Sequence, residues 1–216
     1  MKDYNQNQIA NRLRILYLLW VLIGMFSIMY IPSVIIESGN TEKTAANIFS
    51  NEWLFRIGIV GRLIVQLLFI VIPLLLYKLF DKTDKGLATL MVVFALVSVP
   101  ISMYNEVNQI GILSLSGQEH LIKHSLNTYN NGMSISMIFW GLWLFPLGKL
   151  AYTSGLFPKV VMYFLYIGGL GYLLASFGDL LFASTGDFLF YSELLTFGEL
   201  LFIIWFLFAG IKQKEN

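Results

Sequence analysis

Six long apolar stretches run through this chain, and polar segments separate them. A helix needs about 20 apolar residues to cross the hydrocarbon core of a bilayer. The pattern therefore predicts an all-α, polytopic membrane protein, a bundle of six transmembrane helices that forms one domain over residues 1–216. The expected spans are residues 15–36, 57–78, 87–114, 132–152, 159–183 and 189–211.

Two local patterns modify this plan. Residues 44–51 fit either a short helix on the membrane surface, with Ile48, Phe49 and Trp53 in the interface, or a solvated loop. Pro100 removes a backbone donor from the third span, so we expect a kink about one turn before it.

Composition agrees with a membrane protein and excludes several other classes. Of the 216 residues, 57% are hydrophobic and 12% are charged, whereas soluble domains carry about 25% charged residues. The net charge of +1, without a basic stripe, predicts no nucleic-acid partner. The absence of cysteine excludes disulfides, thiolate metal sites and cysteine nucleophiles.

The distribution of Lys and Arg predicts the orientation of the bundle. Ten of the 14 lie in the N-terminal segment, the second and fourth loops and the C-terminal tail, and three lie in the other loops. Because cytoplasmic loops carry the excess of positive charge, both termini are predicted to be cytoplasmic, which is an N-in/C-in topology. The remaining residue, Arg62, falls inside the second span.

Polar and charged residues gather in the predicted outer half of the spans. At 1.5 Å of rise per residue, Arg62, Glu106 and Glu199 lie roughly 9–12 Å below the outer surface. A charge at mid-bilayer costs roughly 2.5–3.5 kcal/mol, so we expect Arg62 to pair with Glu106 or Glu199. The predicted result is an outward-opening polar chamber lined by the second, third, fifth and sixth spans. Its candidate ligand-binding residues are Arg62, Gln66, Asn105, Glu106, Asn108, Gln109, Asp179, Glu193 and Glu199.

Two interpretations of this set stay open. Interhelical hydrogen bonds in lipid contribute about 0.6 kcal/mol each, so single amides such as Asn105, Asn108 and Gln66 fit a purely structural role. The charged residues together favour a ligand-binding site, because small residues would pack apolar helices together at a lower free-energy cost. Asp179 and Glu193 are shallow enough to be simply hydrated.

A metal site is a weak alternative. His120 and His124 stand four residues apart in a polar segment, residues 115–131, that we expect to be a loop. On a helix this spacing would place both imidazoles on one face. The segment lacks the glutamate of the zincin motif, so we expect no metal and no cofactor.

Small and aromatic residues in the predicted fourth and fifth spans indicate packing between helices. Gly168, Gly171, Ala175 and Gly178 form one stripe that allows close helix approach. Trp140 and Trp143 fit packing better than a ligand slot.

Several runs of residues resemble a known family. They are Thr44–Ile48, Leu54–Val60, Val99–Ile101, Ile138–Gly148, Ser154–Lys159 and Gly168–Leu173. In this order they resemble the bacterial integral membrane family catalogued as domain of unknown function 4386. The resemblance covers nearly the whole chain, and it implies six membrane helices, an uncharacterised activity and a place in the bacterial plasma (inner) membrane. Members often have a His before the Gly that opens the fourth helix, where this chain has Asn131.

The leading functional hypothesis is an outward-facing polar pocket that binds a small polar ligand or a lipid head group. An intramembrane lipid-processing enzyme, with Glu106 and Glu199 or the histidine pair as its chemical groups, is one alternative. A non-catalytic scaffold or partner subunit is another. The expected partners are the lipid bilayer and such a ligand, and the sequence does not fix the oligomeric state.

Overall fold

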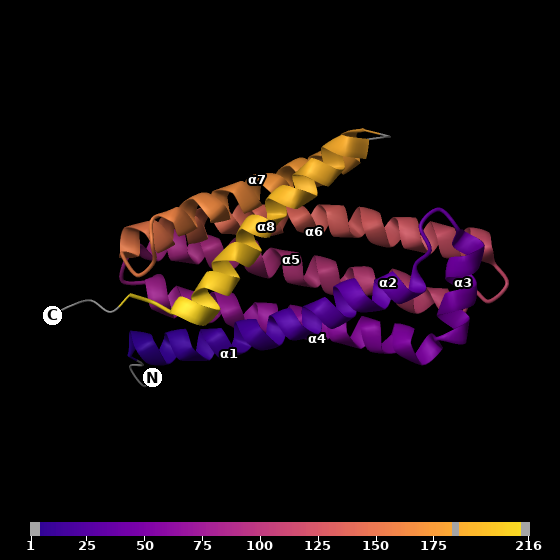
Figure 1. The fold of residues 1–216 in the computed structure, drawn as a ribbon, viewed down its shortest axis with the longest axis horizontal. Helices are drawn as coiled ribbons and strands as arrows, with labels where there is room; N and C mark the ends of the chain where they lie inside the picture. The colour runs from indigo at the N-terminus through magenta and orange to yellow at the C-terminus, as the bar shows by residue number, and fades with distance from the viewer. Residues whose placement is uncertain (1–4, 183–185, 213–216) are drawn as a thin grey trace.

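The computed structural model describes residues 5–182 and 186–212, and the side chains of all of these except 186–189. Every regular element within these residues is helical (Figure 1). The elements are α1 (Gln6–Gly24), η1 (Met25–Tyr30), α2 (Ile31–Ile35), α3 (Thr41–Ser50), α4 (Glu52–Phe80), α5 (Lys85–Ile112), α6 (Glu119–Ser154), α7 (Val160–Leu181) and α8 (Gly186–Ala209).

Six helical segments of the described chain are long and apolar enough to cross a membrane. The first combines α1, the π-helix η1 and α2 into one continuous rod, and α4 to α8 supply the other five. The predicted all-α bundle of six membrane-spanning helices is therefore confirmed. α5 stays helical through Pro100, and the kink expected there stays a prediction.

Several helices begin before the apolar stretches that predicted them, while α7 is slightly shorter than its predicted span. The largest difference is at residues 115–131, which we expected to be a loop, because α6 begins at Glu119. Ile122 is fully buried and Leu126 packs against the same apolar cluster, so this polar segment gains its stability from one buried face. As a consequence, His120 and His124 lie on a helix and not in a loop.

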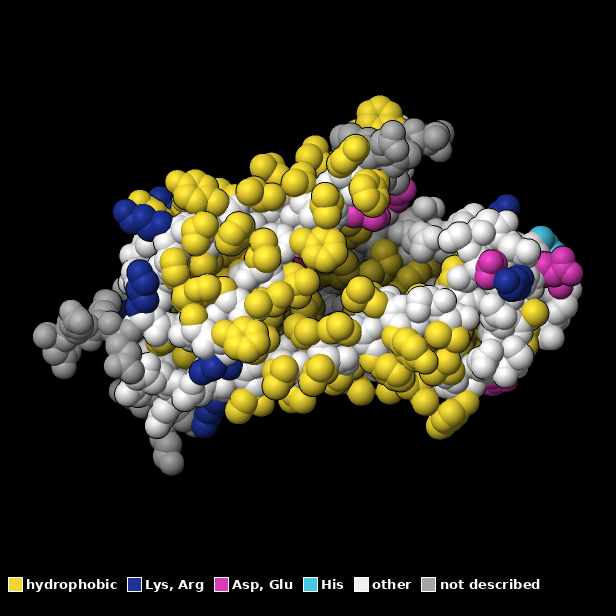
Figure 2. All heavy atoms as spheres, viewed as in Figure 1, with side chains coloured by type: hydrophobic (Ala, Val, Ile, Leu, Met, Phe, Trp, Pro, Cys, Tyr) yellow, Lys and Arg dark blue, Asp and Glu magenta, His cyan; other side chains and the backbone are white. Residues whose placement is uncertain are grey.

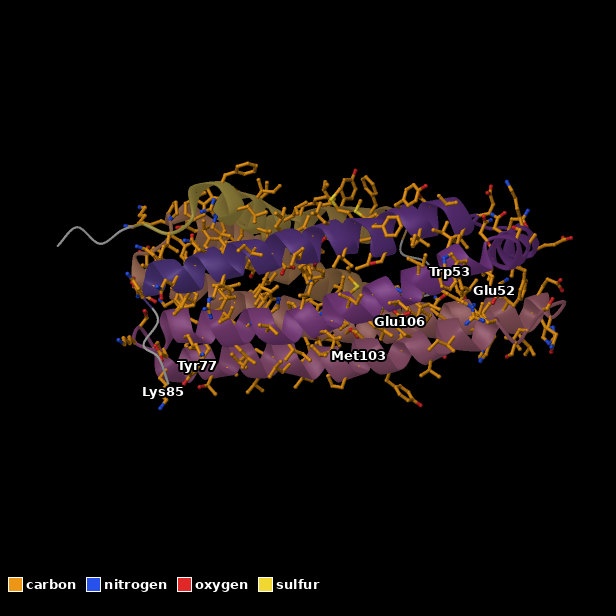
Figure 3. All side chains as sticks on the ribbon, turned by 90° about the horizontal axis from the view of Figure 1, so that it is seen from below. Glu52, Trp53, Tyr77, Lys85, Met103 and Glu106 are labelled. Carbon is orange, nitrogen blue, oxygen red and sulfur yellow. The ribbon has the colours of Figure 1, made fainter. Side chains whose placement is uncertain are left out.

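α3 decides between the two interpretations of residues 44–51 in favour of a helix. The side chain of Asn40 caps it by accepting from the backbone N–H of Lys43 at 2.9 Å. The placement of Ile48 at the membrane interface was wrong, because Ile48 is fully buried against α2 and α4 residues of the bundle. Trp53 is 74% exposed, next to Glu52 at the start of α4 (Figure 3).

Close backbone contacts join the last three helices, as the small-residue stripe predicted. A Cβ added to Gly171 of α7 would lie 2.8 Å from the backbone nitrogen of Thr196 in α8. A Cβ on Gly141 of α6 would lie 2.7 Å from the carbonyl oxygen of Gly169 in α7. Neither distance leaves room for a side chain.

α8 closes the bundle at one end only. There, Arg14 Nε donates to the carbonyl oxygen of Leu207 at 2.9 Å, and Tyr17 packs edge-on against Phe202 and Phe206. Toward the other end α8 crosses away from η1 and α2 (Figure 1). Figure 2 shows that the surface is hollowed between these elements.

Candidate functional site

A buried ion pair joins α4 to α5. Arg62 Nε donates to Glu106 Oε1 at 2.8 Å, and Arg62 Nη2 donates to Glu106 Oε2 at 3.0 Å. The two side chains are 10% and 5% exposed. Figure 3 places Glu106 between the two ends of the bundle, which Glu52 and Lys85 mark. Of the two carboxylates that the sequence offered to Arg62, the structure selects Glu106.

The π-helix η1 supplies a second partner to Arg62. In an α-helix the carbonyl oxygen of Ser27 would accept from Ile31, but the N–H of Ile31 donates to Phe26. One residue further along is Pro32, which has no N–H. The carbonyl of Ser27 is thus free within its helix, and it accepts from Arg62 Nη1 at 3.3 Å.

Tyr129 of α6 completes this cluster. Its hydroxyl donates to Glu106 Oε1 at 3.2 Å, and its ring centroid lies 5.6 Å from the guanidinium carbon of Arg62. A cation over an aromatic face at this distance is attracted by the ring quadrupole. Tyr129 was not among the predicted site residues, because residues 115–131 were expected to form a loop.

Glu199 of α8 is buried without a cationic partner among the described residues. Its side chain accepts a hydrogen bond from the Tyr172 hydroxyl at 3.2 Å, and residue 199 is 7% exposed. The ion pairs that the described residues form involve Glu37, Glu52 and Glu106 as the acids. Glu199 is therefore a buried carboxyl group held by a neutral donor.

These groups line one cavity of about 210 Å³, which we call the inner cavity. Its walls include Arg62, Gln66, Glu106, Tyr129, Tyr172 and Glu199. Contributions come from α1, η1 and α6 as well as from the helices that the sequence had indicated.

Four buried polar atoms of the inner cavity have no hydrogen-bond partner in the described part of the chain. They are Gln66 Oε1, Ser102 Oγ, Trp20 Nε1 and Trp143 Nε1, and all four residues line the cavity. Leaving such a group unsatisfied costs about 1–3 kcal/mol. The described part of the chain thus supplies no partner for these four groups at the cavity wall.

A second cavity of about 500 Å³, the outer cavity, adjoins the first. Its polar wall residues include Glu37, Asn40, Gln109 and Lys123. Both cavities have Ile28, Arg62, Tyr129 and Met133 in their walls. The Arg62–Tyr129 contact therefore stands where the two cavities meet.

Asn105 holds α5 to α6, Asn108 supports the Asn105 side chain, and neither residue lines a cavity. Asn105 Nδ2 donates to the carbonyl oxygen of Tyr129 at 2.7 Å, and Asn108 Nδ2 donates to Asn105 Oδ1 at 2.9 Å. Asn105 sits directly against Gly132, where a Cβ would overlap its amide. This geometry matches the structural role that was one of the two open interpretations.

The remaining candidates lie outside both cavities. Asp179 is an exposed residue that accepts a short hydrogen bond from Ser134, and Glu193 is exposed on α8. His120 and His124 are exposed on α6. The described residues contain no group of three His, Cys, Asp or Glu side chains that could hold a metal ion.

Several residues of the inner cavity were missing from the sequence-based set. Tyr172, Trp20 and Trp143 lie in apolar spans, where hydropathy counts them as lipid-compatible and hides their polar atoms. Ser102 had a usable signal, since it stands four residues before Glu106 and shares its helix face.

Comparison with known proteins agrees with the resemblance drawn from the sequence. An uncharacterised protein of Archaeoglobus fulgidus is 27% identical over 158 residues, which cover 73% of this chain and 86% of that protein. No solved structure matches the chain. The family model described as "Domain of unknown function (DUF4386)" matches residues 15–210. Since that match covers nearly the whole sequence, the chain belongs to the family of domain of unknown function 4386.

Proposed function

We propose that this protein is a membrane-embedded binding protein whose inner cavity takes a small polar ligand or the head group of a lipid. We further propose that it resides in the plasma membrane with both termini in the cytoplasm, so that the outer cavity opens to the outside. The positive-inside distribution of Lys and Arg supports this orientation.

One observation carries the proposal. The inner cavity is lined by a buried ion pair, a buried carboxyl group and residues with four unpartnered polar atoms, all on helices that are apolar enough to span a bilayer. Ionisable residues at membrane depth are costly and mark functional sites by default. Packing alone would be served by apolar side chains, which avoid the desolvation of Arg62 and Glu106.

A test compares two double variants by native mass spectrometry. The first, Arg62→Met with Glu106→Leu, replaces the buried pair by apolar side chains of similar length. The second, Glu52→Leu with Arg56→Met, removes an exposed ion pair of 2.7 Å on α4 and serves as a matched control. Each protein is purified from the same membranes and then supplied with a mixture of phosphatidylethanolamine and phosphatidylglycerol.

We expect wild type and the control to retain a bound small molecule or lipid that the buried-pair variant loses. Retention of the same adducts by all three proteins would contradict the proposal. So would a folded buried-pair variant that keeps its cellular function, which is the result expected of a scaffold.

A further inference from the structure

The charge of the inner cavity favours a cationic ligand. Its walls hold two carboxyl groups, Glu106 and Glu199, and one guanidinium, Arg62. Glu106 is neutralised by its two-point contact with Arg62. Glu199 is then the carboxyl group of the cavity wall that has no cationic partner among the described residues. A buried carboxylate without a counter-charge is costly, and a cation from a ligand would offset that cost.

The ion pair of Arg62 argues against an anionic ligand at the same place. Three of its five N–H groups are already used, two by Glu106 and one by the carbonyl of Ser27. A phosphate or carboxylate bound to the two remaining N–H groups would be a second anion beside Arg62, whose charge Glu106 already balances.

Aromatic rings make up much of the cavity wall. Trp20, Phe69, Tyr129, Trp140, Trp143 and Tyr172 line it. The rings form two groups. In the first, the ring centroid of Phe69 lies 5.1 Å from that of Trp143 and 6.2 Å from that of Trp20. In the second, the ring centroids of Trp140 and Tyr172 lie 6.0 Å apart. Aromatic faces around a carboxylate are the arrangement that binds alkylammonium ions, because the ring faces attract the cation.

The unpartnered polar atoms complement such a ligand. Gln66 Oε1 and Ser102 Oγ can accept hydrogen bonds from an ammonium N–H. Trp20 Nε1 and Trp143 Nε1 can donate to an oxygen close to the ammonium group. The cavity volume of 210 Å³ is more than ten times the roughly 10–15 Å³ that one water needs, which leaves room for a small head group.

From these contacts we infer that the inner cavity binds an organic ammonium group, with Glu199 as its counter-ion inside an aromatic box. The inference rests on the proposed binding function and names its ligand class. The ammonium group can belong to a free amine or to the head group of phosphatidylethanolamine or phosphatidylcholine.

The first experiment uses soluble probes and the full chain in nanodiscs of phosphatidylglycerol, which carries no amine. Choline is titrated against its uncharged carbon isostere, dimethylbutanol, and against glycerol phosphate, all at constant ionic strength. Tryptophan fluorescence reports binding, since three of the five tryptophans line the cavity. Ethanolamine, titrated in the same way, tests a primary ammonium.

We expect saturable binding of choline or ethanolamine and none of the isostere. Glu199→Gln should raise the dissociation constant of the cation at least about tenfold, which corresponds to about 1.4 kcal/mol of binding free energy. Glu193→Gln removes an exposed carboxylate from the same helix and should leave binding unchanged. Thermal unfolding of both variants verifies that they are folded.

The second experiment identifies the source of the ammonium group. Native mass spectrometry in a mixture of phosphatidylethanolamine, phosphatidylcholine and phosphatidylglycerol shows which lipid is retained. If the protein selectively retains phosphatidylethanolamine or phosphatidylcholine and Glu199→Gln abolishes this retention, the ligand is a lipid head group. Soluble cation binding without lipid selectivity identifies a free amine.

Two results overturn the inference and are distinguishable from each other. Binding of glycerol phosphate or dimethylbutanol at the cavity, without the cations, refutes the ammonium ligand and leaves the proposed binding function intact. No saturable binding of any probe, together with no adduct that depends on Arg62 and Glu106, refutes both.

Discussion

Arg62 lies inside an apolar bundle because three neighbouring elements supply its partners. α5 contributes the Glu106 carboxylate, η1 contributes the Ser27 carbonyl and α6 contributes the ring and hydroxyl of Tyr129. Removing both charges from water costs free energy, and the attraction between Arg62 and Glu106 offsets this cost only while both side chains are present. The cluster is therefore sensitive to the loss of one partner and tolerant of the loss of both.

Substitutions at the Arg62–Glu106 ion pair are expected to have non-additive effects on stability. Glu106→Leu alone should destabilise the protein by about 3–5 kcal/mol, because it leaves Arg62 buried and unpaired. Adding Arg62→Met should recover most of that loss. Thermal or denaturant unfolding of the two single variants and the double variant in detergent measures the coupling.

The control for this cycle is the exposed pair of Glu52 and Arg56. Breaking it should change stability by at most about 1 kcal/mol, as for other surface pairs. Equal losses from Glu106→Leu alone and from the double variant would show that Arg62 does not depend on Glu106.

The sequence could predict part of this cluster for a physical reason. The cost of a lone charge in lipid requires a carboxylate partner for Arg62, and depth along the helices left only Glu106 and Glu199 as candidates. It could not predict that Tyr172 holds Glu199, because a tyrosine hydroxyl inside an apolar span has no hydropathy signal. Nor could it separate Gln66, at the cavity, from Asn105, at a helix contact, since that depends on how the helices rotate about their axes.

At the level of the element, hydropathy found every span but not always where the helix begins and ends. Hydropathy detects only the part of a helix that must be apolar to lie in lipid. α6 also includes polar sequence, because Ile122 and Leu126 pack into an apolar cluster there. The contact between α7 and α8, in contrast, was predictable from the sequence. The stripe of small residues on α7 indicated close packing, and the structure brings Gly168 and Gly171 against the backbone of α8.

The contact between α7 and α8 yields a second prediction. A Cβ on Gly198 would overlap the carbonyl oxygen of Phe164, which is backbone and cannot move aside. Gly198→Ala should therefore separate these helices and destabilise the protein by about 1–3 kcal/mol, as overpacking does. The melting temperature in detergent measures the effect.

Gly24→Ala provides the matched control for this prediction. Gly24 is also within a helical segment, and a Cβ there would meet nothing within 4 Å. Removing the flexibility of glycine from a helix should stabilise by about 0.5–1 kcal/mol. If Gly198→Ala were as stable as Gly24→Ala, the close approach of α7 and α8 would be wrong.

For the molecule as a whole, the cavities have a consistent position in the bundle. The start of α1 and the end of α8 lie at one end, where Tyr17, Phe202 and Phe206 pack together (Figure 1). The outer cavity lies at the other end, since its walls include residues of the first loop such as Gly39 and Asn40. The proposed ligand would thus enter from the side of the membrane opposite to the termini.

The side of the membrane that the outer cavity faces can be measured directly, because the chain contains no cysteine and each introduced thiol is unique. Lys82 lies in the turn between α4 and α5, and Ser116 lies in the loop between α5 and α6 at the opposite end. With both termini cytoplasmic, Ser116→Cys should react with an impermeant maleimide in intact cells, whereas Lys82→Cys should react only after permeabilisation. The reverse pattern would turn the outer cavity toward the cytoplasm, so that any ligand of the inner cavity would have to arrive from within the cell.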